Sequence, residues 1–190
     1  MMPENVLGIN SRSEFRKWLE EHCESEKECR VAVRKGRPIE GEDCLWYLDA
    51  VEEALCFGWI DSNCIFKDGK AYQRFSPRRK NGNWTELNKE RVRRLVKLGL
   101  MSSQGMKALP KGFNRFSMDK EVERALKAAR VWSRFKSFPE LYRRVRSSNV
   151  AFYRKVDAET YAAALDNLIS NTRKGIMYGD WNDYGRLLDY

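Results

Sequence analysis

The chain has 190 residues, 42% hydrophobic and 33% charged, and its 36 Lys and Arg against 27 Asp and Glu give a formal net charge of +9. This composition supplies enough apolar surface for a core and excludes an intrinsically disordered chain. No run of about 18 apolar residues occurs, and the N-terminus lacks the basic and apolar regions of a signal peptide. We therefore expect a cytoplasmic protein with no transmembrane segment.

The content of cysteine and histidine argues against disulfides and metal sites. The cysteines are odd in number and form no Cys-x-x-Cys pair, which favours reduced thiols in a core. One histidine and these cysteines also lack the paired spacing that a tetrahedral zinc site requires. We predict no disulfide, no metal and no cofactor; the cysteines are Cys23, Cys29, Cys44, Cys56 and Cys64.

The first elements in chain order are a short strand, a helix and a second strand. Residues 6–9 are apolar enough for the first strand. Ser11 and Glu14 form a capping box that opens a helix ending near His22. Apolar and polar residues then alternate over 29–33, the pattern of a half-buried strand.

A helix and a hairpin follow in the middle of the chain. Apolar residues three or four apart predict a helix over 44–57, with Gly58 as its left-handed cap. Asp68 and Gly69 lie between two predicted short strands, residues 62–66 and 71–75. Asp-Gly in that position predicts a tight hairpin, because its turn needs positive φ angles.

The remaining elements are helices. Thr85 is placed to cap one helix, a second begins at Ser102 or Ser103, and residues 110–114 form a linker. Three more helical stripes follow, beginning near residues 122, 139 and 157, and we expect residues 179–186 to pack back on them. The predicted fold is α+β, a small antiparallel sheet with packed helices over residues 1–112, followed by a C-terminal helical module over 113–190.

Aromatic and charged residues gather around the turns between residues 59 and 88. Guanidinium groups bind phosphates or carboxylates through paired hydrogen bonds, and tryptophan faces offer stacking surfaces. Asp61 is positioned to orient a ligand, and equally to cap a turn or to pair with Arg74 or Arg78. We predict a basic, aromatic ligand-binding cleft without catalytic residues, made of Trp59, Asp61, Arg74, Arg78, Arg79, Trp84 and Asn88.

The same residues carry a family resemblance. They comprise Glu-Glu-Ala-Leu-Cys-Phe-Gly-Trp-Ile-Asp at 52–61, Tyr-Gln-Arg-Phe-Ser-Pro-Arg-Arg at 72–79, then Trp84, Asn88 and the helix through Arg91 and Val92. This ordered pattern resembles the bacterial YdeI/OmpD-associated family, also labelled bacteriocin-protection proteins. The resemblance covers about residues 6–110 and, in its helical module, 122–175. It implies a YjbR/CyaY-like α+β fold and an association with resistance to cationic antimicrobial peptides.

Three specific functions remain open from the sequence, besides a scaffold role in an assembly. The first is a non-enzymatic binding or stress-protection protein whose cleft takes a small anion or a protein partner. The second is nucleic-acid binding along Arg91, Arg93, Arg94, Lys97 and the basic helix after Arg124, with a strong salt dependence. The third is an enzyme that acts on a small anionic metabolite, with Asp61 as base. Walker, G-x-G-x-x-G and G-x-S-x-G motifs are absent, so no known catalytic motif favours the third function.

Overall fold

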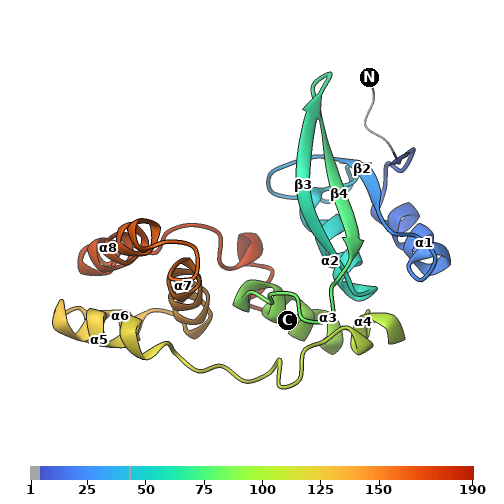
Figure 1. The fold of residues 1–190 in the computed structure, drawn as a ribbon. Helices are drawn as coiled ribbons and strands as arrows, with labels where there is room; N and C mark the ends of the chain where they lie inside the picture. Colours follow the sequence, from blue (N-terminus) through green and yellow to red (C-terminus); the bar gives the residue numbers. More distant parts are fainter. Residues whose placement is uncertain (1–4, 43) are drawn as a thin grey trace. The chain divides into compact units, whose positions relative to one another are not determined.

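The computed structural model describes residues 5–42 and 44–190, and the chain divides into two compact units (Figure 1). The first unit comprises the residues up to 82 together with 91–111, and the second comprises 83–90 and 112–190. Residues 83–90 therefore join the C-terminal helices, although the sequence division had placed them in the N-terminal domain. The expectation drawn from residues 1–4, the start of the N-terminus, lies outside the described residues.

The first unit contains a four-stranded sheet in the order β1-β2-β4-β3. Its strands are β1 (Val6–Leu7), β2 (Cys29–Val33), β3 (Trp59–Lys67) and β4 (Lys70–Pro77). The pairs β2–β4 and β3–β4 are antiparallel, whereas β1 pairs with β2 in parallel. The predicted α+β class is confirmed, and the sheet is mixed rather than purely antiparallel because the short edge strand runs beside β2.

The β3–β4 hairpin forms around the predicted turn and is longer than predicted. Asp68 and Gly69 have φ angles of 48° and 72°, as an Asp-Gly hairpin turn requires. Pairing extends from the turn back to Trp59 opposite Pro77, with one irregularity between Asp61 and Cys64. Such an irregularity changes the direction of side chains along the strand.

Two helices of the first unit cover one face of this sheet, as Figure 1 shows. Helix α1 (Arg12–His22) begins with the predicted capping box, and its Phe15 ring lies 5.2 Å from that of Phe75. Helix α2 (Tyr47–Cys56) reaches Asp61 through the Tyr47 hydroxyl. Phe75 and Asp61 are partners across β3 and β4, so their side chains leave the sheet on the same face. Both helices therefore pack on that face.

Helix α2 starts later than predicted and ends in a close helix contact. Residues 44–46 run beside the end of β2, where the Arg34 amide donates to the Leu45 carbonyl at 2.9 Å. Gly58 has the expected positive φ of 75°. Gly105, in helix α4 (Ser103–Lys107), lies so close that an added Cβ would stand 2.1 Å from the Cys56 carbonyl oxygen. Only a glycine permits this approach.

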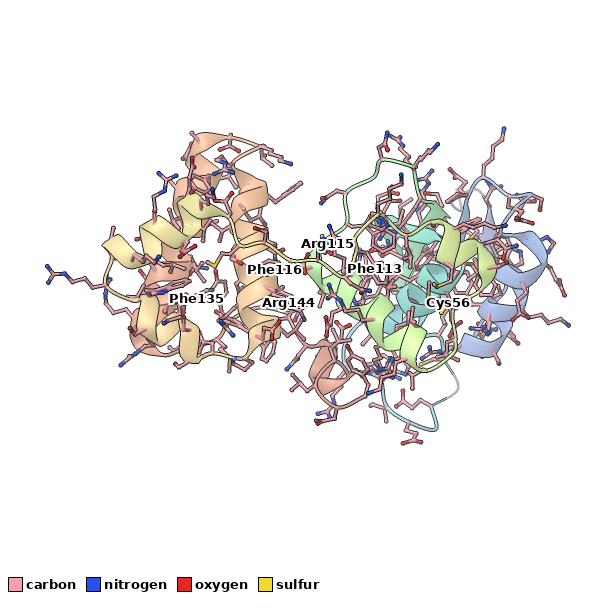
Figure 2. The ribbon with its side chains drawn as sticks, turned by 90° about the horizontal axis from the view of Figure 1, so that it is seen from below. Cys56, Phe113, Arg115, Phe116, Phe135 and Arg144 are labelled. Carbon is pink, nitrogen blue, oxygen red and sulfur yellow. The ribbon has the colours of Figure 1, made fainter. Side chains whose placement is uncertain are left out.

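The second unit is built from helices, and no strand occurs among its described residues. It contains α5 (Lys120–Ala128), α6 (Trp132–Ser137), α7 (Glu140–Tyr153), α8 (Ala158–Lys174) and the 3-10 turn η1 (Asp183–Gly185). Helix α3 (Glu86–Lys97) begins in this unit and continues into the first. Phe135 is fully buried among these helices (Figure 2), and Trp181 packs on the same core, as predicted for the C-terminal segment.

Candidate functional site

The seven predicted ligand-binding residues fall in both units of the molecule. Trp59, Asp61, Arg74, Arg78 and Arg79 belong to the first unit, whereas Trp84 and Asn88 belong to the second. In the second unit, Trp84 lines a pocket of about 680 Å³, and the Asn88 amide donates to the Thr85 hydroxyl, which confirms the predicted cap. Neither unit by itself therefore contains all seven residues.

Trp59 lies in the core of the first unit. It is 1% exposed, and its indole N–H donates to the Cys23 carbonyl at 3.1 Å. Its ring meets that of Trp18 edge to face at 5.7 Å. These contacts satisfy the indole within the fold, and its burial leaves no face open for a ligand.

Arg74 and Arg79 lie away from Asp61. Arg74 precedes Phe75 on β4 and so leaves the sheet on the opposite face from Asp61. There its guanidinium pairs with Glu28, and this hydrogen bond raises the pKa of Arg74. Arg79 is exposed in the loop after β4. Of the two ion pairs considered for Asp61, the one with Arg74 is wrong.

Asp61 and Arg78 are brought together. The Tyr47 hydroxyl donates to Asp61 Oδ2 at 2.7 Å, which links the first residue of α2 to β3. Burial lowers the pKa of Arg78 to about 10, and the charge of Asp61 acts in the opposite direction. Titratable groups perturbed in this way concentrate at functional sites.

Lys35 extends this group of residues. Its Nζ donates to Gln73 Oε1 at 3.0 Å and lies 3.5 Å from the centre of the Tyr47 ring. Partial burial lowers the pKa of Lys35, against the opposing charges of Cys64 and Asp61. Among the described residues, Lys35 forms no ion pair with a carboxylate. We refer to Lys35, Tyr47, Asp61, Gln73 and Arg78 as the Lys35 site.

Sequence reasoning missed Lys35, Tyr47 and Gln73. Gln73 lies on the same helix-covered face of β4 as Ala71 and Phe75, because side chains two residues apart in a strand share a face. Most side chains on such a covered face are apolar. It is 2% exposed, and its amide N–H donates to the Ser62 carbonyl at 2.8 Å. The sequence did contain one signal for Gln73, namely a glutamine at a predicted strand position whose neighbours two residues away, Ala71 and Phe75, are both apolar. Lys35 and Tyr47 gave no comparable signal, because only the fold brings them to Gln73.

Lys35 is also one of the described residues that line a pocket of about 580 Å³, whereas the other four residues of the Lys35 site are not part of that lining. Among its described lining residues Arg34, Lys35 and Lys70 are cationic, and none is acidic. Arg34 is held by Glu42 and lies 4.9 Å from the Trp46 ring. Phe66 contributes an aromatic side chain that is 74% exposed. The pocket therefore combines positive charge with an accessible aromatic surface.

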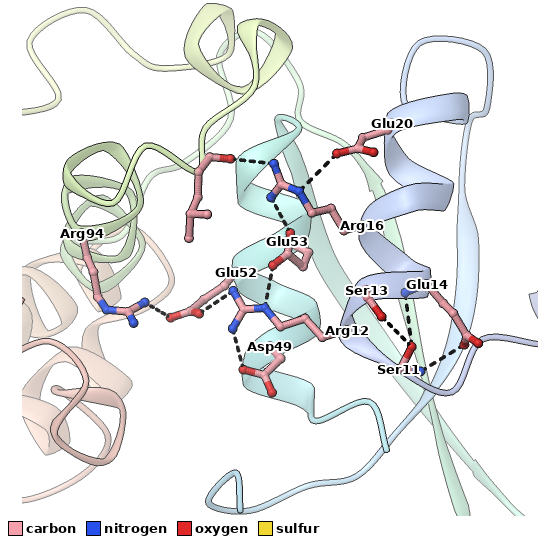
Figure 3. A network of polar contacts seen from close by, with 11 residues as sticks. Ser11, Arg12, Ser13, Glu14, Arg16, Glu20, Asp49, Glu52, Glu53 and Arg94 are labelled. Atoms are coloured by element: carbon pink, nitrogen blue, oxygen red, sulfur yellow. Dashed lines mark hydrogen bonds and ion pairs between the residues drawn. The ribbon is translucent and has the colours of Figure 1, made fainter. Parts of the chain in front are cut away.

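A second polar cluster lies along helix α2, as Figure 3 shows. Glu52 is fully buried and pairs with Arg12 at 3.1 Å and with Arg94 at 2.9 Å. Glu53 pairs with Arg12 and Arg16, and Asp49 also pairs with Arg12. Burial alone would lower the pKa of Arg12, but the charges of Glu53 and Glu52 outweigh it and raise the pKa. Three carboxylates balance three guanidinium groups, which is typical of a structural network.

The thiols and possible metal ligands offer no additional chemistry in the described part of the chain. All five cysteines are free. Burial raises the pKa of Cys29 and of Cys56 to about 12, so both thiols remain protonated and unreactive near neutral pH. Within residues 5–42 and 44–190 there is no group of three or more His, Cys, Asp or Glu suited to a metal ion. No helix among them is long and apolar enough to span a membrane.

Fold and site together define an α+β protein with a cationic pocket beside its sheet. Residues 7–108, more than half of the chain, match the family Domain of unknown function (DUF8412). The chain belongs to this family. No curated protein and no solved structure matches it. The matched segment contains all five residues of the Lys35 site.

Proposed function

We propose that this protein is a non-enzymatic binding protein that takes a small anionic ligand at the Lys35 site. The observation that supports this proposal most is the Lys35 ammonium, which is held by Gln73 and the Tyr47 ring and has no carboxylate in ion-pair contact among the described residues. Lys35 is also part of the lining of the pocket of about 580 Å³. A cation that is partly desolvated and still open to solvent gains free energy when an anion reaches it. This arrangement is typical of an anion site.

The size and lining of the pocket restrict the class of ligand that can bind. Small-molecule sites commonly measure about 300–1,000 Å³, and this pocket falls within that range at about 580 Å³. Lys70 adds a second cation, and Phe66 with the buried Leu45 supplies apolar walls. We infer a small organic molecule whose carboxylate or phosphate group lies against Lys35.

Calorimetric titration with citrate, pyrophosphate and benzoate at constant ionic strength tests this proposal. At least one of these anions should bind the wild type, and Lys35→Met should weaken that binding at least tenfold, by about 1.4 kcal/mol. Lys17→Met is the matched control, because Lys17 is an exposed lysine of helix α1 in the same unit. Equal loss in both variants, or no binding of any of the three anions, would contradict the proposal.

An enzyme acting on a small anionic metabolite is the second candidate. It is favoured by the lowered pKa of Lys35 and by the hydrogen bond from Tyr47 to Asp61. Asp61→Asn separates the two functions. For a binding protein it removes a negative charge near the ligand and should strengthen anion binding about threefold. For an enzyme with Asp61 as base it should abolish turnover of the bound anion.

Nucleic-acid binding, the cytoplasmic location and the relation to the YdeI/OmpD-associated family stay predictions. Of the arginines suggested for nucleic acid, Arg94 is directed to the buried Glu52. Protection against cationic peptides would fit an anion-binding protein only indirectly. The binding of a small anion is therefore the function that the contacts favour most.

A further inference from the structure

Arg146, on helix α7 of the second unit, is a buried cation that forms no ion pair with a carboxylate of the described residues. Its side chain belongs to a residue that is 9% exposed. One terminal nitrogen, Nη2, donates to the Asp180 carbonyl, and the buried Nε has no hydrogen-bond partner among the described residues. Among the described residues, no carboxylate lies within ion-pair distance of this guanidinium. Such burial is costly for an uncompensated charge.

Neighbouring arginines of the same unit are compensated. Arg144, two residues earlier on α7, pairs with Glu90 at 2.8 Å. Arg154, just after the end of α7, pairs with Asp119 at 2.7 Å. The absence of a carboxylate at Arg146 is thus a local property and not the general condition of this basic unit.

The Arg146 guanidinium is held in a fixed position. It lies against Gly179, where an added Cβ would stand 2.8 Å from Nη1. The Tyr178 ring lies 5.1 Å from its central carbon. These contacts and the hydrogen bond to the Asp180 carbonyl order the side chain before a ligand binds, so less conformational entropy is lost on binding.

Arg146 is one of the residues that line a pocket of about 390 Å³, together with residues of helices α7 and α8 and with Tyr178. Asn149 contributes an amide, Val150 and Ala164 contribute apolar wall, and Tyr153 and Tyr178 contribute aromatic rings. The pocket is far larger than one oxyanion group needs. Its lining therefore suits a molecule with an anionic group at one end and an apolar or aromatic body.

We propose that this pocket is a second binding site, in which Arg146 takes the carboxylate or phosphate group of a small aromatic anion. Guanidinium groups match both oxyanions with their planar array of donors. The aromatic body of the ligand would lie along Tyr153 and Tyr178. This site is independent of the Lys35 site, because all of its residues belong to the second unit.

Ligand-observed NMR with benzoate, phenyl phosphate and benzamide tests the proposal on the full chain. Benzoate or phenyl phosphate should bind with a dissociation constant of about 1 mM or lower, and the neutral benzamide should bind at least tenfold more weakly. Comparison of the two anions identifies which oxyanion the pocket prefers. Protein-observed amide spectra of the wild type, recorded with the same ligands, should show chemical-shift changes at Asn149 and Tyr178. Binding of neither anion, or equal binding of benzamide, would overturn the proposal.

Two variants and one control assign the binding to this pocket. Arg146→Met should weaken binding at least tenfold, whereas Arg134→Met should leave it unchanged. Arg134 is the matched control because its guanidinium also donates to a backbone carbonyl, that of Arg173 at 2.7 Å. Ala163→Trp fills the exposed rim of the pocket and leaves Arg146 intact. If Arg146→Met fails to fold, this variant still tests whether the ligand binds in this pocket. Wild-type affinity in Ala163→Trp would place the ligand elsewhere.

Discussion

Helix α2 connects two polar clusters of opposite character. Along its buried side, Asp49, Glu52 and Glu53 are matched by arginines from α1 and α3. At its first residue, Tyr47 touches Lys35 and Asp61, and there the Lys35 ammonium has no carboxylate in ion-pair contact among the described residues. Both clusters are rich in charge, so charge alone does not mark a binding site.

The difference lies in balance and access. Buried charges that compensate one another hold elements in place, and removing one leaves its partner uncompensated in a poorly solvated position. An accessible cation beside a pocket can instead be compensated by a ligand. The network is therefore expected to respond to mutation through stability, and the Lys35 site through binding.

The largest effect is expected for Glu52→Gln in the network. The substitution leaves Arg12 and Arg94 without a fully buried counter-charge and should lower the free energy of unfolding by about 3–5 kcal/mol. Urea titration followed by NMR of first-unit amides measures the loss. Glu20→Gln removes an exposed partner of Arg16 and should cost less than about 1 kcal/mol. Similar values for both variants would remove the distinction between network and surface.

Gly105→Ala tests the packing that fixes the C-terminal end of α2. The new Cβ would meet the Cys56 carbonyl, a backbone atom that moves only with its helix, so we expect a loss of about 3 kcal/mol. Gly8→Ala is the control, because no atom of the described residues beyond its chain neighbours lies within 4 Å of its added Cβ. Thermal unfolding of the two variants provides the comparison. A loss at Gly105 no greater than at Gly8 would show that α2 and α4 separate easily.

The dependence of stability on alkaline pH tests how completely the core beside α2 excludes water. The pKa values of Cys29 and Cys56 rise to about 12 in the fold, from 9.0 for a free thiol. Unfolded thiols therefore lose protons first, and the stabilisation present below pH 9 should decline above it, by about 2 kcal/mol at pH 10. Urea titrations at pH 8 and 10 measure this change, and Cys29→Ala should halve it.

The comparison of stabilities stops at pH 10, because above this pH the deprotonation of Arg78 changes the free energy of unfolding in the opposite direction. The folded guanidinium, with a pKa of about 10, releases its proton before the unfolded one does, so deprotonation there favours the fold. A wild-type stability that is unchanged between pH 8 and 10 would contradict the burial of the two thiols.

The smallest effect on stability is expected for Lys35→Met. Loss of the hydrogen bond to Gln73 is offset by relief of the partly desolvated ammonium, so the free energy of unfolding should change by less than about 1 kcal/mol. The same variant should lose anion binding in the calorimetric titration. A large loss of stability would show that Lys35 is a structural residue like Glu52. It would contradict the distinction between the charge network along α2 and the Lys35 site.

Much of the local structure followed from the sequence, because its signals are local. The capping box at Ser11, the Asp68-Gly69 turn and the cap at Thr85 depend on side chains a few residues apart. The start of α2 was missed because residues 44–46 pair with the end of β2, a contact that periodicity does not contain. Of the predicted ligand-binding residues, Asp61 and Arg78 belong to the Lys35 site, whereas Trp59 fills the core.

The sequence by itself determined the fold class, the order of the elements and the excess of positive charge. Those properties depend on residue type and short-range spacing, which the chain states directly. Only the tertiary structure decided which charges are compensated. Arg12 meets Glu52 from another helix, and Lys35 meets Gln73 across 38 residues of chain. Ion pairing depends on distances of a few ångströms between residues far apart in sequence, and those distances exist only after folding.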